Sequence, residues 1–148
     1  MASTFRADTR AGIVTAAQAF QTANPTLLYA VHAIRPTRYS GDIPFGYVEL
    51  RDERIRHTAG TRIRELAPSF VVVGRPLENT QQAGDWDTLV DALVDHFTDY
   101  AHLSANTVWD EMTLTDESEE IQSADGSSRV YPQVRFNFGN VSAMEGRS

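Results

Sequence analysis

One stretch decides how the middle of this chain folds: residues 53–65 read ERIRHTAGTRIRE. Apolar and charged residues alternate on both sides of a turn, the period-2 pattern of a strand pair. A three-residue loop from Thr58 to Gly60, with Gly60 in the left-handed conformation, is a common way to close such a pair. We therefore predict a protruding β-hairpin over about residues 53–65.

The odd loop length predicts which side chains share a face of this hairpin. It places Ile55 opposite Ile63 and leaves the arginines together on the other face. Like charges directly opposite one another destabilise a sheet, so such a face is expected to meet something negative. The predicted face consists of two opposed pairs, Arg54 with Arg64 and Arg56 with Arg62.

The chain before the hairpin predicts one helix and two strands. Apolar residues recur near every 3.6 positions over residues 4–23, with Thr4 as a plausible N-cap, and Asn24-Pro25 ends this helix. The apolar run over residues 27–34 is typical of a strand covered on both faces. A second strand is expected over residues 45–50.

The chain after the hairpin predicts a buried strand at residues 70–73, a polar connection over residues 77–84, and a helix that Asp85 caps. The apolar positions of this helix follow the i, i+3, i+4, i+7 pattern. Carboxylates four residues apart line its opposite face: Asp87, Asp91, Asp95 and Asp99.

The last third of the chain alternates between strand and loop signals. We predict a strand over residues 107–114, a mobile acidic loop over residues 115–128 and a strand over residues 129–138, with Pro132 marking an edge or a bulge. Residues 139–148 are expected to form a flexible tail. In the last strand one face is predicted to carry Gln133, Arg135 and Asn137.

These elements predict an α+β fold in a single domain over residues 1–138. Two helices pack on a mostly antiparallel sheet of five to six strands, from which the hairpin protrudes. A length of 148 residues suits one domain. The absence of cysteine excludes disulfides and thiolate metal sites.

The net charge is -7, but positive and negative residues are concentrated in different segments of the chain. Residues 1–75 hold ten arginines against six acids, residues 76–128 hold thirteen acids and no base, and residues 129–148 have a balance of +2. All basic residues are arginine. The acidic total, the lack of lysine and the lack of aromatics among the hairpin arginines argue against nucleic-acid binding.

No catalytic, cofactor or metal signature is present. The histidines have no metal-ligand or general-base spacing, and there is no nucleophile elbow or glycine-rich phosphate loop. An enzyme would need a concave pocket with convergent polar groups, for example around His32 or His57.

Opposite charges on separate elements favour self-association instead. Guanidinium groups suit carboxylates, so the arginine face of the hairpin could meet the acidic helix face of a neighbouring copy. Head-to-tail contacts of this kind close into rings. Whether the two faces pair within one subunit or between two stays open at this point.

Several runs resemble the tail terminator proteins of long-tailed phages that infect actinobacteria. They are YSGDIPFGYV at residues 39–48, DE at 52–53, HTAGT at 57–61, VVV at 71–73 and DxLVDALVD at 87–95. The resemblance covers about residues 11–138 and the order of elements, and the arginine-only composition agrees with a GC-rich host. Related neck and tail-completion proteins share this size and architecture.

The resemblance implies a structural protein of the virion without enzyme activity or cofactor. Such proteins form a hexameric ring on the head-proximal end of the tail tube, stop the addition of tube subunits and provide the docking surface for the head connector. The implied partners are further copies of the chain, the tube protein and the connector, with no membrane and no sequence-specific nucleic acid, although DNA could pass through the ring.

Within this hypothesis the acidic loop is the candidate for contact with tube or connector, because it could repel an acidic surface or order on binding. Its carboxylates are Asp116, Glu117, Glu119, Glu120 and Asp125. The tail over residues 139–148 is a second candidate. The ring is expected to assemble in the host cytoplasm and to reside at the head–tail junction. Two alternatives stay open: a head-side neck protein that joins head to tail, and a small acidic cytoplasmic enzyme.

Overall fold

The computed structural model of the chain describes residues 4–37, 43–99, 109, 111–122, 126, 128–139 and 141–146. These residues form two helices and a six-stranded mixed sheet, which confirms the predicted α+β fold. The elements are α1 (Phe5–Ala23), β1 (Ala30–His32), β2 (Phe45–Thr58), β3 (Thr61–Val73), α2 (Thr80–Thr98), β4 (Glu111–Gln122), β5 (Ser128–Gly139) and β6 (Val141–Gly146).

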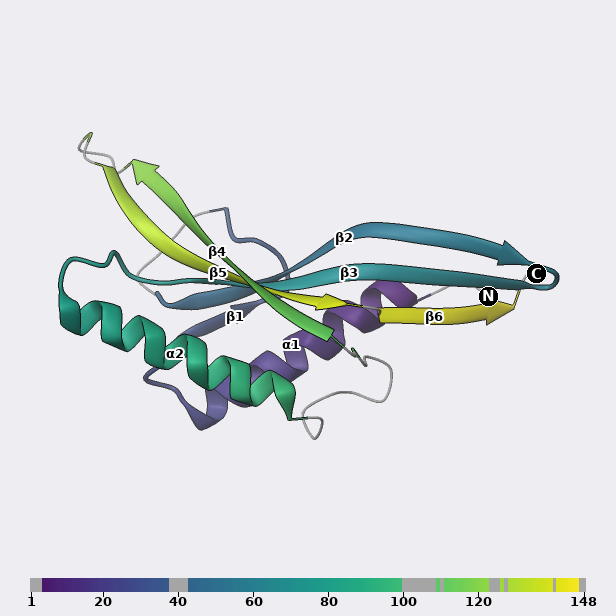
Figure 1. Cartoon of the computed structure of the whole chain (residues 1–148), viewed down its shortest axis with the longest axis horizontal. Helices are drawn as coiled ribbons and strands as arrows, with labels where there is room; N and C mark the ends of the chain where they lie inside the picture. Colours follow the sequence, from purple (N-terminus) through teal and green to yellow (C-terminus); the bar gives the residue numbers. More distant parts are fainter. Residues whose placement is uncertain are drawn as a thin grey trace.

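The sheet has the strand order β1-β2-β3-β5-β4 (Figure 1). Among the pairs of described strands, only β1–β2 is parallel. Strand β3 pairs with β2 along one side, and along the other side with β5 over residues 69–73 and with β6 over residues 61–66. Strands β5 and β6 thus lie one after the other beside β3.

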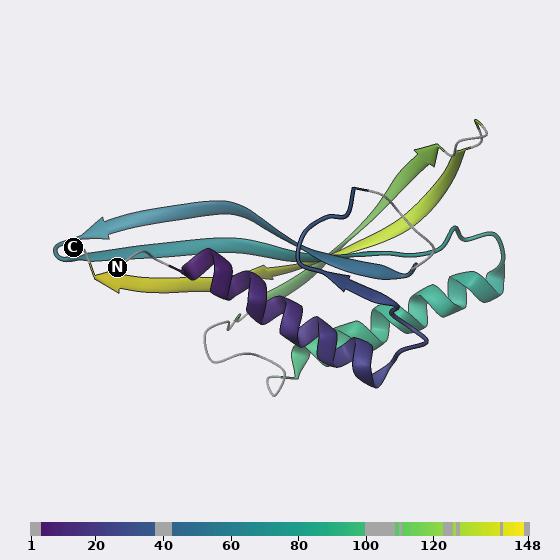
Figure 2. The same cartoon turned by 180° about the vertical axis from the view of Figure 1, so that it is seen from behind.

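Both helices cover the same face of the sheet (Figures 1 and 2). Because side chains alternate along a strand, every second residue points into the layer between sheet and helices. There the ring of Phe97 on α2 packs edge to face against Phe70 and at a tilt against Phe136. Gly46 belongs to this face because the Phe70 ring occupies the space of a side chain there. The opposite face has its own small buried cluster: Phe45, Tyr47, Val71 and Val73.

Three strands extend past the helical layer and form what we call the arm: β2 from Arg51 to Thr58, β3 from Thr61 to Leu66, and β6 (Figures 1 and 2). The predicted flexible tail over residues 139–148 is therefore wrong for Gly139, which ends β5, and for residues 141–146. Val141 is buried against the core, and burial of this side chain holds the strand beside β3.

The hairpin register differs by one residue from the predicted one. Thr58 pairs with Thr61 across the turn, so Ile55 lies opposite Arg64 and Arg56 lies opposite Ile63. Gly60 does adopt the left-handed conformation, with φ of 74°. The predicted face of four arginines does not exist, because an even loop length moves one strand's side chains to the other face.

A β-bulge in β2 at the base of the arm reverses which residues of this strand point to each face of the sheet. The pairing of β2 with β3 shifts between Arg51 and Arg54, and Asp52 has a positive φ of 54°. The extra residue turns Arg54 and Arg56 toward the face away from the helices. Glu53 and Ile55 turn toward α1.

The second helix begins earlier than predicted. Asn79 is its N-cap and accepts a hydrogen bond from the Gln82 amide at 2.9 Å, so Asp85 lies inside the helix. The predicted polar connection over residues 77–84 is wrong from Thr80 onward. The strand predicted over residues 27–34 is shorter, Ala30–His32.

The predicted acidic loop is also wrong. Residues 115–122 continue β4, which pairs with β5 from Glu111 opposite Gly139 to Gln122 opposite Ser128. Pro132 lies in β5, an inner strand, at the point where β3 ends. Of the strand predicted over residues 107–114, residues 107, 108 and 110 lie outside the described part of the chain.

Candidate functional site

The arginines of the arm are divided between its two faces. Arg54 and Arg56 lie on the face away from the helices, whereas Arg62 and Arg64 lie on the face toward α1. The structure therefore does not bring these four side chains together, although all four are in the arm.

Two of these arginines have acidic partners in the arm itself. Arg56 Nη2 lies 2.7 Å from Glu65 Oε1, and Arg64 Nε donates to Glu53 Oε1 at 2.9 Å. The Arg64 side chain is only 12% exposed and its guanidinium lies 5.3 Å from the centre of the Phe5 ring. Arg64 consequently fastens the arm to α1 and is not available to a partner, whereas Arg54 and Arg56 remain exposed.

The carboxylates predicted on the second helix form an exposed row. Asp87, Asp91 and Asp95 are exposed on α2, and Asp99 is its exposed C-cap. Helix α2 and the tip of the arm lie toward opposite ends of the molecule in both ribbon views (Figures 1 and 2).

The acidic residues of β4 alternate between two environments. Glu117 and Glu119 lie on the face away from the helices, because they pair with Gln133 and Tyr131 of β5. Asp116 and Glu120 lie on the other face and are exposed. Asp125 lies outside the described residues.

An ion-pair network joins four segments on the face away from the helices. Arg135 donates to Glu49 at 2.5 Å and to Glu117 at 3.1 Å, and Arg51 lies 2.7 Å from the same Glu49. Nearby, Glu119 accepts from Arg35 at 2.6 Å and also from Gln133. Sequence reasoning placed Gln133, Arg135 and Asn137 together on one face, which the structure confirms, but it did not find their partners on β2 and β4.

Arg135 of this network and Tyr47, which senses the network's charges, have perturbed pKa values. Burial lowers the pKa of Arg135, but the hydrogen bonds and charges of Glu49 and Glu117 outweigh it, so the net pKa is raised. Burial raises the pKa of the Tyr47 phenol, and the charge of Glu49 adds to the rise. The nearby Arg35 and Arg135 oppose it only in part.

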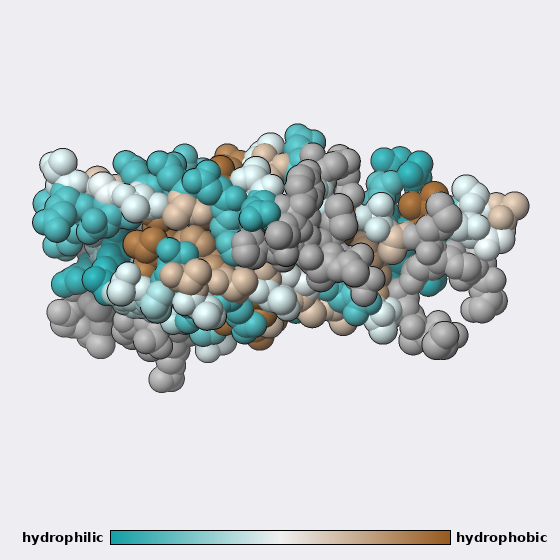
Figure 3. All heavy atoms as spheres, turned by 90° about the horizontal axis from the view of Figure 1, so that it is seen from below, coloured by the Kyte–Doolittle hydropathy of each residue, from teal (hydrophilic) through white to brown (hydrophobic). Residues whose placement is uncertain are grey.

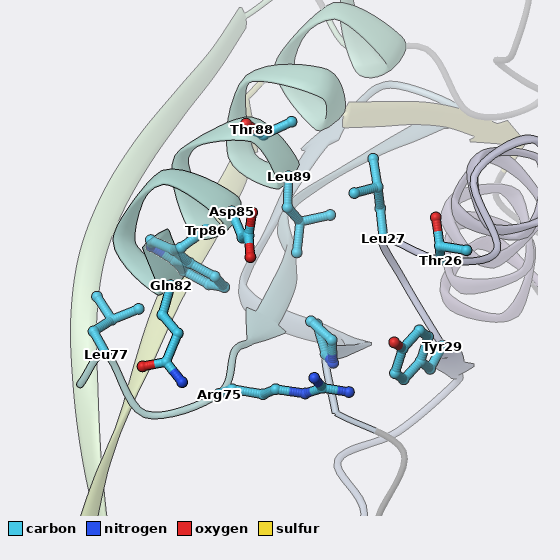
Figure 4. A pocket seen from close by; sticks show the side chains of 11 residues that line it. Thr26, Leu27, Tyr29, Arg75, Leu77, Gln82, Asp85, Trp86, Thr88 and Leu89 are labelled. Atoms are coloured by element: carbon cyan, nitrogen blue, oxygen red, sulfur yellow. The ribbon is translucent and has the colours of Figure 1, made fainter. Parts of the chain in front are cut away.

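A pocket of about 330 Å³ lies between the start of α2 and the segment after α1 (Figure 4). Leu27 and Leu89 form part of its apolar wall, and the Arg75 guanidinium crosses its floor, 5.3 Å from the centre of the Tyr29 ring. On the side of the molecule that carries the helices, an apolar patch surrounded by hydrophilic residues is exposed (Figure 3). A second pocket of about 260 Å³ shares Arg75 and Gln82.

The histidines stand apart from these pockets. His32 packs edge to face against Phe45, His57 is exposed in the arm, and His96 Nε2 donates to the carbonyl of Ala16 at 2.6 Å. Neither pocket is lined by a histidine. His102 lies outside the described residues.

The described part of the chain contains no group of three or more histidine, aspartate or glutamate residues placed to hold a metal ion. None of its helices is both long and apolar enough to cross a membrane.

No protein-family model and no curated protein matches this sequence.

Proposed function

We propose that this chain is a phage tail terminator, a subunit of a ring that caps the head-proximal end of the tail tube. The sequence resemblance at residues 39–48, 57–61, 71–73 and 87–95 suggests the family. The described α+β fold is compatible with it.

The observation that carries the proposal is the arm. Three paired strands extend beyond the helical layer and expose Arg54 and Arg56, while the acidic strand β4 and helix α2 point toward the other end (Figures 1 and 2). The outer part of this extension, residues 54–60, is exposed in its own subunit and is suited to reach a neighbour. Different surfaces at opposite ends favour head-to-tail contact, which closes into a ring when the rotation between copies allows it.

A terminating ring must also refuse a further ring of tube subunits. The exposed carboxylates Asp116 and Glu120 are held on a paired strand, not on a loop that orders on binding. We therefore assign refusal to repulsion between this fixed acidic surface and an acidic tube surface. The connector would carry the complementary positive charge.

Loss of the gene from its phage tests the role. We expect tails of excessive and variable length that are not joined to heads, seen by electron microscopy. Tails of normal length beside unjoined heads would instead assign a head-side neck role. Wild-type tails joined to heads, or a purified protein that stays monomeric at high concentration in physiological salt, would contradict the proposal.

A further inference from the structure

Among the strand edges of the described sheet that have no partner strand, those of β2 and β4 are longer than those of β1 and β6. β2 pairs with β1 only as far as Tyr47, so its outer side from Val48 to Thr58 meets no described strand, and the same is true of the outer side of β4. Unpaired edges readily accept a strand from another chain. These two edges lie on opposite sides of the sheet, at β2 and at β4.

The charges of these edges oppose pairing of each edge with its own copy. A β2–β2 contact centred on residues 54–56 would bring Arg54 and Arg56 against the same arginines, and a β4–β4 contact would bring carboxylates together. The combination that matches charges is β2 of one copy with β4 of another. This combination is head-to-tail and leaves a free edge at each end until a ring closes.

The strand directions fit the same combination. β2, β3, β5 and β4 are successively antiparallel, so β2 and β4 run in opposite directions within one subunit. A neighbouring copy with the same strand directions therefore places its β2 antiparallel to β4. Because Glu117 is level with Phe45 across the sheet, the neighbour must also be displaced along the strands for its arm to reach Glu117.

In this arrangement the arginines of one copy and the glutamates of the next lie on the same face of the joined sheet, with the same spacing. Arg54 and Arg56 lie two residues apart on the face away from the helices, and so do Glu117 and Glu119. Antiparallel pairing can set Arg54 opposite Glu119 while Arg56 lies opposite Glu117. The Glu117 and Glu119 side chains remain 36% and 27% exposed beside their partners within the subunit, so a second cation can approach each of them.

We propose that subunits join through their backbones, with the arm strand β2 of one copy added antiparallel to β4 of the next and Arg54 and Arg56 facing Glu119 and Glu117. The inference rests on the proposed ring, and it replaces the acidic helix α2 with the acidic strand β4 as the partner of the arm.

Neutral variants of near-equal shape test the pairing. Arg54→Gln with Arg56→Gln in one chain, and Glu117→Gln with Glu119→Gln in another, should each weaken assembly about ten-fold or more per interface, measured by sedimentation velocity. Asp87→Asn with Asp91→Asn is the matched control on α2 and should leave assembly unchanged. If the α2 variant weakens assembly and the β4 variant does not, the inference is overturned while the ring stands.

A charge exchange separates pairing from misfolding. A chain with Arg54→Glu and Arg56→Glu, and a chain with Glu117→Arg and Glu119→Arg, should each stay monomeric, but an equimolar mixture should form rings in which the two chains alternate. Failure of the mixture, when both chains unfold cooperatively by circular dichroism, would overturn the inference.

Hydrogen exchange gives a readout of the backbone itself. The outward-facing amides of residues 54–58 and 115–119 should become protected when the wild-type concentration is raised through the assembly transition. Rings without this protection would contradict strand addition but not the proposed function. A chain that never assembles would contradict both.

Discussion

Arg135 of β5 reaches across β3 and donates to Glu49 of β2, with 2.5 Å between Nη1 and Oε2. The Arg135 side chain is only 9% exposed and also binds Glu117 of β4. One cation thus links three strands on the face that has no helix over it.

Replacing Arg135 with methionine should lower the free energy of unfolding by about 3 kcal/mol, because Glu49 and Glu117 would then face each other without their shared cation. Urea unfolding at pH 7 measures this change. Arg51→Met is the matched control: it removes a cation from the same Glu49, but Arg51 is 53% exposed, so the loss should stay below about 1 kcal/mol. Equal losses would mean that burial of Arg135 does not matter.

The raised pKa of Tyr47 predicts a loss of stability in alkali. The folded state keeps the phenolic proton above pH 10, where the unfolded state releases it, so unfolding becomes more favourable as pH rises. This contribution is fully present below pH 10 and is lost between pH 10 and the pKa of the folded state. In that range the free energy of unfolding falls by at most about 1.4 kcal/mol per pH unit.

Tyr47→Phe checks the origin of that slope. At pH 7 the variant should unfold within about 1 kcal/mol of wild type, because the buried ring is retained. Between pH 9 and 11 its stability should fall less steeply. Parallel curves for the two proteins would contradict the assignment to Tyr47.

Two glycines should respond to alanine in opposite ways. A Cβ at Gly46 would lie 2.1 Å from Cζ of Phe70, so Gly46→Ala should cost about 1–3 kcal/mol through displacement of the ring. A Cβ at Gly84 would meet nothing within 4 Å on exposed α2, so Gly84→Ala should add about 0.5–1 kcal/mol. Melting temperatures by calorimetry provide the comparison, and two shifts of the same sign would be inconsistent with it.

The observed start of α2 makes a third pair of variants informative. Asn79→Ala should cost about 1 kcal/mol, since the Gln82 amide loses its acceptor. Asp85→Ala should cost nothing or stabilise slightly, because alanine is favoured inside a helix. If Asp85→Ala were the more damaging change, the helix would begin where the sequence pattern suggested.

Periodicity was sufficient for the elements that bury a continuous apolar face. Both helices and the strand ending in Val71 to Val73 follow from it, because the pattern and the core involve the same residues. The acidic strand β4 could not be predicted in this way. Its neighbours Arg135 and Gln133 lie in β5, and local composition carries no record of such partners.

The register of the arm could not be predicted from the sequence, for a different reason. Alternation fits both an odd and an even loop around Gly60, and the two choices differ by one residue in every pair. The bulge at Asp52 then exchanges the faces again without a glycine or proline to mark it. Two of the predicted interface arginines, Arg62 and Arg64, therefore lie on the face toward α1, opposite to the face of Arg54 and Arg56.

The position of β3 between β2 and β6 also has a consequence for biosynthesis. Thr61 pairs with Gly146 and Leu66 with Val141, so the second neighbour of β3 in the arm follows α2, β4 and β5 in the sequence. Pairings this distant in sequence form late. A nascent chain that has not yet emerged as far as β6 thus has an incomplete arm, and any partner that recognises the finished arm can bind only after β6 has been synthesised.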